Sequence, residues 1–125
     1  MSRPRTQPRR RAERWGRTAE TLCSVLLRLK GYRIVGRRVR TAVGEIDLVA
    51  RRGQTLAIIE VKARADAAAG LTAVSAHQRH RIERAAEAFL AVRPQHGHLH
   101  LRFDVMVVRP FGWPMHVADA WRPEA

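Results

Sequence analysis

The chain has 125 residues, a length that allows one domain with a hydrophobic core but not two, and its hydrophobic fraction of 46% favours a globular protein. It holds no apolar run of the ~18–20 residues that a transmembrane helix needs, and no apolar segment follows its arginine-rich start as a secretory signal would require. Its one cysteine, Cys23, excludes an intramolecular disulfide and a cysteine-based zinc site. These features predict a cytoplasmic protein that does not insert into membranes.

The net charge of +13 is the strongest compositional signal. Residues 1–14 hold six arginines and one glutamate, so the basic excess extends well beyond the N-terminal segment. Biased codon usage would explain arginine in place of lysine, but not basic residues in place of acidic ones. The charge therefore predicts a polyanionic partner. Nucleic acid is the first candidate and an anionic membrane surface is the second. Only Lys30 and Lys62 are lysines, which makes both positions notable.

The first half of the chain predicts an arm, a helix and three strands. Residues 1–13, rich in arginine and poor in apolar side chains, predict a flexible basic arm, and residues 14–125 a single domain. From residue 15 to residue 30 the apolar residues recur every three or four positions, which indicates an amphipathic helix with Glu20 at the margin of its apolar stripe. Strands are expected at 32–40, 43–50 and 55–62, the last two forming a hairpin.

The second half predicts a loop, a helix and one or two strands. Small residues and Gly70 favour a loop at 63–72, and residues 74–92 favour a second helix with an apolar stripe. Strict alternation over 99–107 predicts a strand with one buried face, and 115–118 could add a short final strand. The order α-β-β-β-α-β predicts an α/β fold with a mixed sheet flanked by helices.

The hairpin carries the charged residues that a small core would normally exclude. A two-residue turn centred between Gly53 and Gln54 would put Asp47 opposite Glu60 and on the same face as Lys62. Two neighbouring carboxylates repel when buried, and a divalent cation relieves that repulsion. Their hard oxygen atoms suit Mg²⁺ or Mn²⁺, Lys62 suits activation of a water molecule, and Glu20 could add a ligand.

Five motifs then resemble a known family, and the resemblance spans roughly residues 15–121. They are "GRTAE" (16–20), "GY" (31–32), "GEIDLVA" (44–50), "EVKAR" (60–64) and "RFDV" (102–105). Together they resemble the YraN-like family of bacterial proteins, in the restriction-endonuclease-like superfamily, whose signature is an aspartate followed by (D/E)-x-K. That family is similar to archaeal Holliday-junction resolvases. The resemblance implies the αβββαβ core of this superfamily, a mixed sheet between helices.

The resemblance also implies roles for individual residues. Asp47, Glu60 and the Val61 carbonyl would hold Mg²⁺ (or Mn²⁺), Lys62 would be the catalytic lysine, and Glu20 would match the helical acid of resolvase-like members. The implied activity is endonucleolytic hydrolysis of phosphodiester bonds, with DNA favoured over RNA and branched or structured DNA among the candidate substrates. Cutting paired strands would need two active sites, which favours a homodimer. Two departures are Ile46 in place of proline and Gln78 where relatives often have lysine.

Other readings of the same residues stay open. Asp47, Glu60 and Lys62 could form a surface salt-bridge cluster. The protein could then be a nucleic-acid-binding module that does not cut its partner. It could also be a basic protein that binds a ribosome or an acidic protein. The N-terminal arm could contact nucleic acid or be a solvated tail.

Several other side chains are assigned provisional roles. The candidate phosphate contacts are Arg51, Arg52 and Arg64. His96, His98 and His100 share strand parity, which is weak evidence for a metal site. Asp104 is expected to pair with an arginine or to support the site. Trp113 and Trp121 are expected to be packing residues, because base stacking would need exposure.

Overall fold

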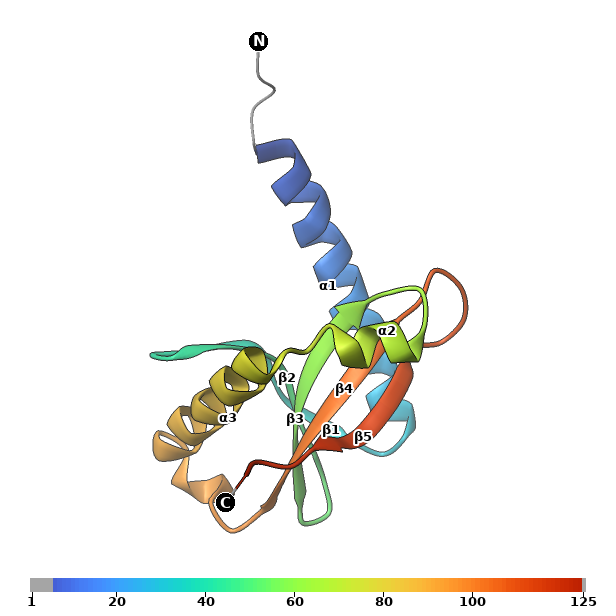
Figure 1. Ribbon diagram of the computed structural model, residues 1–125. Coiled ribbons are helices and arrows are strands. Elements are labelled where there is room, and N and C mark those ends of the chain that lie inside the picture. The colour runs from blue at the N-terminus through green and yellow to red at the C-terminus, as the bar shows by residue number, and fades with distance from the viewer. Residues whose placement is uncertain (1–5, 125) are drawn as a thin grey trace.

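The computed structural model describes residues 6–124, with side chains from residue 17 onward (Figure 1). Its elements are α1 (Thr6–Leu29), β1 (Arg33–Thr41), β2 (Gly44–Arg52), β3 (Thr55–Ala63), α2 (Ala67–Thr72), α3 (Ala76–Ala91), the 3₁₀ turn η1 (Pro94–His96), β4 (His100–Val108) and β5 (Met115–Trp121). The expected α-β-β-β-α-β order is confirmed, with α2 inserted and β5 completing the sheet. No helix within residues 6–124 is both long and apolar enough to span a bilayer.

The five strands form one mixed sheet in the order β1-β2-β3-β4-β5. β3 and β4 are parallel, and the other neighbours are antiparallel. α1 covers one face of the sheet, and α2 and α3 lie on the other (Figure 1). The predicted mixed sheet flanked by helices is therefore confirmed.

Each face of the sheet has its own hydrophobic core. One core packs α3 residues such as Phe89 against Ile58 and Val105, and the other packs α1 residues such as Leu27 against Ile59. Cys23 lies fully buried in the α1 core, and this burial raises the pKa of its thiol to about 12. The cysteine is therefore an inert packing residue, as its position in the apolar stripe predicts.

The prediction of one buried face for the fourth strand is wrong. Every residue from Phe103 to Val108 is buried, including Met106 and Val108 on the α1 side. β4 lies inside the sheet between β3 and β5, so helices cover both of its faces. Asp104 lies on the same side of β4 as Met106 and Val108 and is fully buried. A charged residue at that position makes this side of the strand look solvent-exposed in the sequence, so the apolar pattern does not reveal that it is buried.

The predicted start of the first helix also differs from the structure. α1 begins at Thr6 and not at residue 15, so residues 6–13 of the expected arm are helical, while residues 1–5 lie outside the described part of the chain. Pro8 falls in the first helical turn, where no intrahelical N–H bond is required. The division into arm and domain stays a prediction.

The expected loop at 63–72 contains the helix α2. Asp66 caps it by accepting a hydrogen bond from the Ala69 N–H at 2.8 Å. Gly70 lies against Val107 of β4 so closely that an added Cβ would lie 2.8 Å from Val107 Cγ1 and closer still to Cγ2. The glycine that suggested a loop in the sequence instead permits close helix–sheet packing.

We expect Gly70→Ala to lower the free energy of unfolding by about 1–3 kcal/mol, since Val107 is fully buried and its branched side chain has little freedom to move. Urea unfolding measures this. The control is Ala68→Ser at an exposed position of the same helix, expected to change stability by no more than ~0.5 kcal/mol. Equal stability of Gly70→Ala and wild type would show that the α2–β4 contact is loose.

Candidate active site

The β2–β3 hairpin has the predicted register. Its pairs run from Leu48 with Ile59 to Arg52 with Thr55, around a Gly53-Gln54 turn in which Gly53 has φ of +60°. Asp47 directly precedes Leu48 in β2, and its Oδ2 accepts a hydrogen bond from the Val61 N–H of β3 at 2.8 Å. The backbone of β3 thus fixes the carboxylate beside Glu60.

Glu60 is held by two side chains although it is only 8% exposed. Its Oε1 accepts a hydrogen bond from Gln78 Nε2 of α3 at 2.9 Å and lies 3.4 Å from Lys62 Nζ. Gln78 reaches it because α3 begins beside the hairpin, where the Ser75 side chain caps the helix by accepting from the Gln78 N–H. Asp47, Glu60 and Lys62 therefore gather on the face of the sheet that α3 covers.

Burial makes the two carboxylates hard to ionise together. Burial, and next the charge of Asp47, raise the pKa of Glu60 to about 8, although Lys62 opposes this change. Burial also raises the pKa of Asp47, against the lowering effect of the Val61 hydrogen bond. Lys62 alone does not compensate the negative charges of buried Glu60 and partly buried Asp47. The pair therefore has the electrostatic character of a cation site or an acid–base site.

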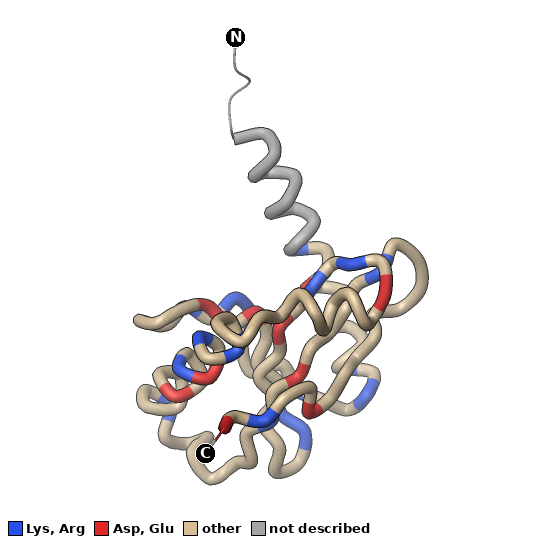
Figure 2. Tube along the Cα trace, viewed as in Figure 1, with Lys and Arg blue, Asp and Glu red and all other residues tan. Residues whose placement is uncertain are grey.

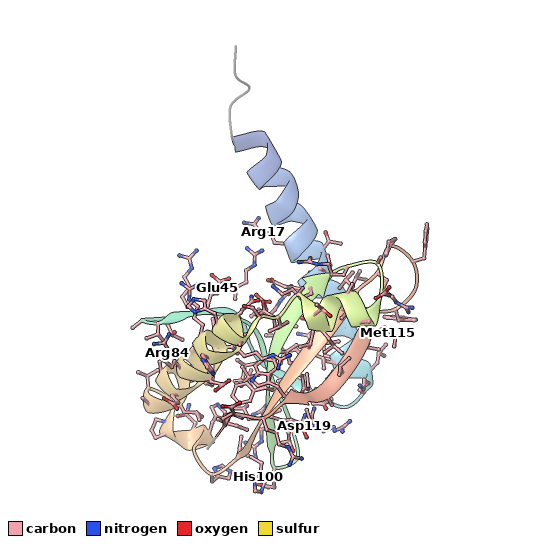
Figure 3. The ribbon with its side chains drawn as sticks, viewed as in Figure 1. Arg17, Glu45, Arg84, His100, Met115 and Asp119 are labelled. Atoms are coloured by element: carbon pink, nitrogen blue, oxygen red, sulfur yellow. The ribbon has the colours of Figure 1, made fainter. Side chains whose placement is uncertain are left out.

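The carboxylates open into a hollow of about 290 Å³ at the start of β2. Besides Asp47 and Glu60, its lining includes Gln78, Arg81 and Glu45, the last of which Figure 3 labels. Mg²⁺ commonly takes one or two protein carboxylates and keeps several waters. Two hard carboxylates with raised pKa values, facing a polar hollow, fit such an ion.

Glu20 does not join the carboxylate pair directly. Its Oε2 accepts a hydrogen bond from Arg38 Nε at 2.8 Å, and burial raises its pKa with a smaller contribution from the charge of Asp47. Glu20 is therefore near the site but neutralised by an arginine. Within the described residues, no three His, Cys, Asp or Glu side chains are gathered as a metal site, so the expected third carboxylate ligand is not assembled.

The predicted phosphate contacts separate into two groups. Arg64 is exposed just beyond the end of β3, two residues after Lys62. Arg51 and Arg52 flank the hairpin turn at the other end of β2, where Arg52 stacks on Tyr32 at 4.5 Å and donates to the Lys30 carbonyl. Five residues of strand, roughly 16 Å, separate Arg52 from Asp47. The structure therefore brings Arg64, but not Arg51 or Arg52, to the site end of the sheet.

Three residues near the carboxylates were not predicted from the sequence. Gln78 bonds to Glu60, Arg81 lines the hollow, and Arg38 pairs with Glu20. The position of Gln78 one helical turn before the buried Ile82 is compatible with an inward direction. No comparable signal marks Arg38, which has φ of +49° in a strand disturbed by a bulge near Gly36.

Asp104 belongs to a separate, internally satisfied network. It is fully buried, and its oxygens accept hydrogen bonds from Arg102 Nε and Nη2 at 2.8 Å and from the Asp119 N–H at 3.0 Å, and lie 2.8 Å from His116 Nε2. Burial alone would raise its pKa, but these hydrogen bonds lower it below the ordinary value. The expected pairing with an arginine is confirmed.

The expected strand parity of the three histidines is wrong. His96 lies in η1, buried and stacked on Phe89, and only His100 belongs to β4. Among the residues that Figure 2 colours, basic residues occur in many separate parts of the trace. The carboxylate pair therefore remains the candidate site that the structure supports.

The raised pKa of Glu60 makes stability depend on pH. The unfolded chain ionises this group near 4.5 and the folded chain near 8, so folding loses stability as pH rises through this interval. Glu60→Gln keeps an oxygen for Gln78 and Lys62 and cannot ionise. We expect it to raise the Tm of metal-free protein by about 3 °C or more at about pH 8.5, with no gain near pH 4.

Thermal unfolding in a chelating buffer across this pH range measures the effect. Glu87→Gln, an exposed glutamate of α3, is the control and should melt like wild type at each pH. A Tm difference between Glu60→Gln and wild type that stays constant with pH would show that Glu60 ionises normally.

Comparison with other proteins identifies relatives over most of the chain. The family described as "Uncharacterised protein family UPF0102" matches residues 19–108. A UPF0102 protein of Parvibaculum lavamentivorans is 54% identical over 112 residues, covering 90% of this chain and 84% of its own. One from Maricaulis maris is 52% identical over 118 residues, covering 94% and 93%, and one from Paramagnetospirillum magneticum is 44% identical over 125 residues, covering 97% of each.

These matches include Glu20 and both strands of the site hairpin, and they agree with the YraN-like resemblance of the sequence motifs. The chain belongs to the UPF0102 family.

Proposed function

We propose that this protein is a metal-dependent nuclease that hydrolyses phosphodiester bonds in DNA. The observation that carries the proposal is the pair of neighbouring carboxylates, partly buried Asp47 and buried Glu60, with Lys62 Nζ 3.4 Å from Glu60. The net charge of +13 supports a polyanionic substrate. The family resemblance supports the D…ExK reading of these three residues.

Asp47, Glu60 and the Val61 carbonyl would hold the metal ion, Mg²⁺ or Mn²⁺. When bound, such an ion supplies Lewis-acid stabilisation of negative charge on the phosphate and lowers the pKa of a water ligand. Lys62 orients the attacking water and offsets charge that develops in the transition state. Gln78 holds Glu60 in place through its 2.9 Å hydrogen bond, and Glu20, paired with Arg38, lies near the site on α1.

Arg64 and Arg81 are the proposed phosphate contacts nearest the carboxylates. Arg81 lines the same hollow, and Arg64 is exposed beyond Lys62 at the end of β3. Arg51 and Arg52 would contact a DNA strand only at a point further from the carboxylates, at the other end of β2. A second copy of the chain would supply the second active site that cutting two strands requires. We place this activity in the cytoplasm, on DNA rather than RNA.

Calorimetric titration of Mn²⁺, with a short noncleavable DNA oligonucleotide present, tests the metal site. We expect wild type to bind the ion and the double variant Asp47→Asn plus Glu60→Gln to lose at least about tenfold in affinity, since its amides carry no negative charge. Glu87→Gln removes an exposed carboxylate of α3 and should bind like wild type. Equal binding by the double variant, or none by wild type, would overturn the metal site.

Cleavage of single-stranded, duplex and four-way-junction DNA, with RNA alongside, tests the activity. We expect Lys62→Ala to lower the cleavage rate by at least about 100-fold while substrate affinity changes little, because Lys62 acts mainly on the transition state. Arg84→Ala removes an exposed positive charge from α3 (Figure 3) and should leave cleavage unchanged.

Two outcomes would contradict the activity. Equal rates for Lys62→Ala and wild type would show that the lysine has no catalytic role. Metal and DNA binding by wild type without cleavage of any of these substrates would favour a non-catalytic binding module.

A further inference from the structure

The segment between β4 and β5 exposes two aromatic rings. Residues 109–114 read Arg-Pro-Phe-Gly-Trp-Pro, and within them Phe111 is 88% exposed and Trp113 is 55% exposed. Trp121, by contrast, is 7% exposed and stacks on Phe103 with ring centroids 5.2 Å apart. The expectation of a packing role is confirmed for Trp121 and wrong for Trp113.

The loop is shaped by its own contacts, which leave the rings outside. Arg109 Nη2 donates a hydrogen bond to the Trp113 carbonyl at 3.3 Å, and Gly112 takes φ of +88°, a conformation that favours glycine. Pro110 and Pro114 restrict the backbone on either side. A short loop with fixed φ angles loses little conformational entropy when its aromatic side chains bind a partner.

The loop leaves the sheet beside the end of β3 that carries Lys62. β3 and β4 are parallel, with Lys62 paired to Val107, and the Arg64 N–H donates to the Val108 carbonyl at 3.1 Å. Figure 1 shows the loop projecting beyond the sheet at the end where both strands finish. Figure 3 labels Met115, where β5 begins, far from His100 at the opposite end.

The chemistry of this surface matches one class of partner. A hollow of about 180 Å³ at the base of the loop is lined by Arg64, Val108 and Pro110, and Arg109 lies next in the chain. Exposed aromatic rings beside arginines are how proteins hold single strands, because each base has a face on which a ring can stack while cations contact the phosphates. The positive net charge agrees with such a partner.

We propose that residues 109–115 form a stacking platform for unpaired nucleobases, with Phe111 and Trp113 contacting bases and Arg64 and Arg109 contacting the adjacent phosphates. This rests on the proposed function in its choice of nucleic acid as partner, and it specifies the substrate as DNA with single-stranded or unpaired segments. A DNA strand bound to this platform would continue past Lys62 toward Asp47 and Glu60.

Fluorescence anisotropy of an end-labelled single-stranded oligonucleotide, in a chelating buffer at fixed salt, tests the platform without requiring metal or cleavage. We expect Phe111→Ala and Trp113→Ala each to weaken binding roughly fivefold to 150-fold, equivalent to about 1–3 kcal/mol at about 1.4 kcal/mol per factor of ten. Affinity for a blunt duplex of the same sequence should change less. Val92→Ala, at a residue that is 76% exposed at the end of α3, should bind like wild type.

Leucine substitutions separate stacking from general apolar contact. Phe111→Leu and Trp113→Leu keep apolar surface but lose the aromatic face, so stacking predicts that they bind single strands as weakly as the alanine variants. Unchanged affinity in the alanine variants would overturn the platform, as would restored affinity in the leucine variants. Aromatic-dependent capture by anionic lipid vesicles, without an effect on oligonucleotide binding, would overturn it in favour of a membrane contact.

The single-strand binding test does not depend on whether the carboxylate pair binds a metal ion. Loss of single-strand affinity in the aromatic variants would support the platform even if Asp47→Asn plus Glu60→Gln bound Mn²⁺ normally and the nuclease proposal failed.

Discussion

The β2–β3 hairpin places two carboxylates side by side, those of buried Glu60 and partly buried Asp47, and the rest of the site is arranged around that constraint. Antiparallel pairing around Gly53-Gln54 brings Asp47 next to Glu60, and the burial of β3 removes the water that would separate their charges. The Val61 N–H, Lys62 and the Gln78 amide each offset part of the cost. The raised pKa values of both acids show that the cost is offset incompletely.

Asp104 is a buried carboxylate whose negative charge is fully compensated, in contrast to Asp47 and Glu60. Asp104 is as deeply buried as any side chain in the protein, yet Arg102, His116 and the Asp119 N–H surround it, and its pKa is lowered. That carboxylate is a structural anchor between β4 and β5. Asp47 and Glu60 have fewer donors and face a hollow, which is the condition in which a buried acid can bind a cation or exchange a proton.

The sheet order also decides which surfaces lie close enough together to contact the same substrate. Because β3 and β4 are parallel neighbours, their ends bring Lys62, Arg64 and the exposed aromatic loop to one end of the molecule. The β2–β3 turn, with Arg51 and Arg52, lies at the other end. A substrate that contacted both ends would have to pass along the sheet and its covering helices.

The sequence by itself determined the α-β-β-β-α-β order of the core, the hairpin register and the placement of Asp47 beside Glu60, because these depend on local periodicity and on a two-residue turn. It could not determine that β4 is covered on both faces, that Gly70 lies in a helix packed on Val107, or that Arg38 neutralises Glu20. The partners of Glu60 from α3 and the exposure of Trp113 were also decided only by the tertiary structure. Those features depend on which elements meet across long sequence separations, whereas propensity and spacing describe only neighbours along the chain.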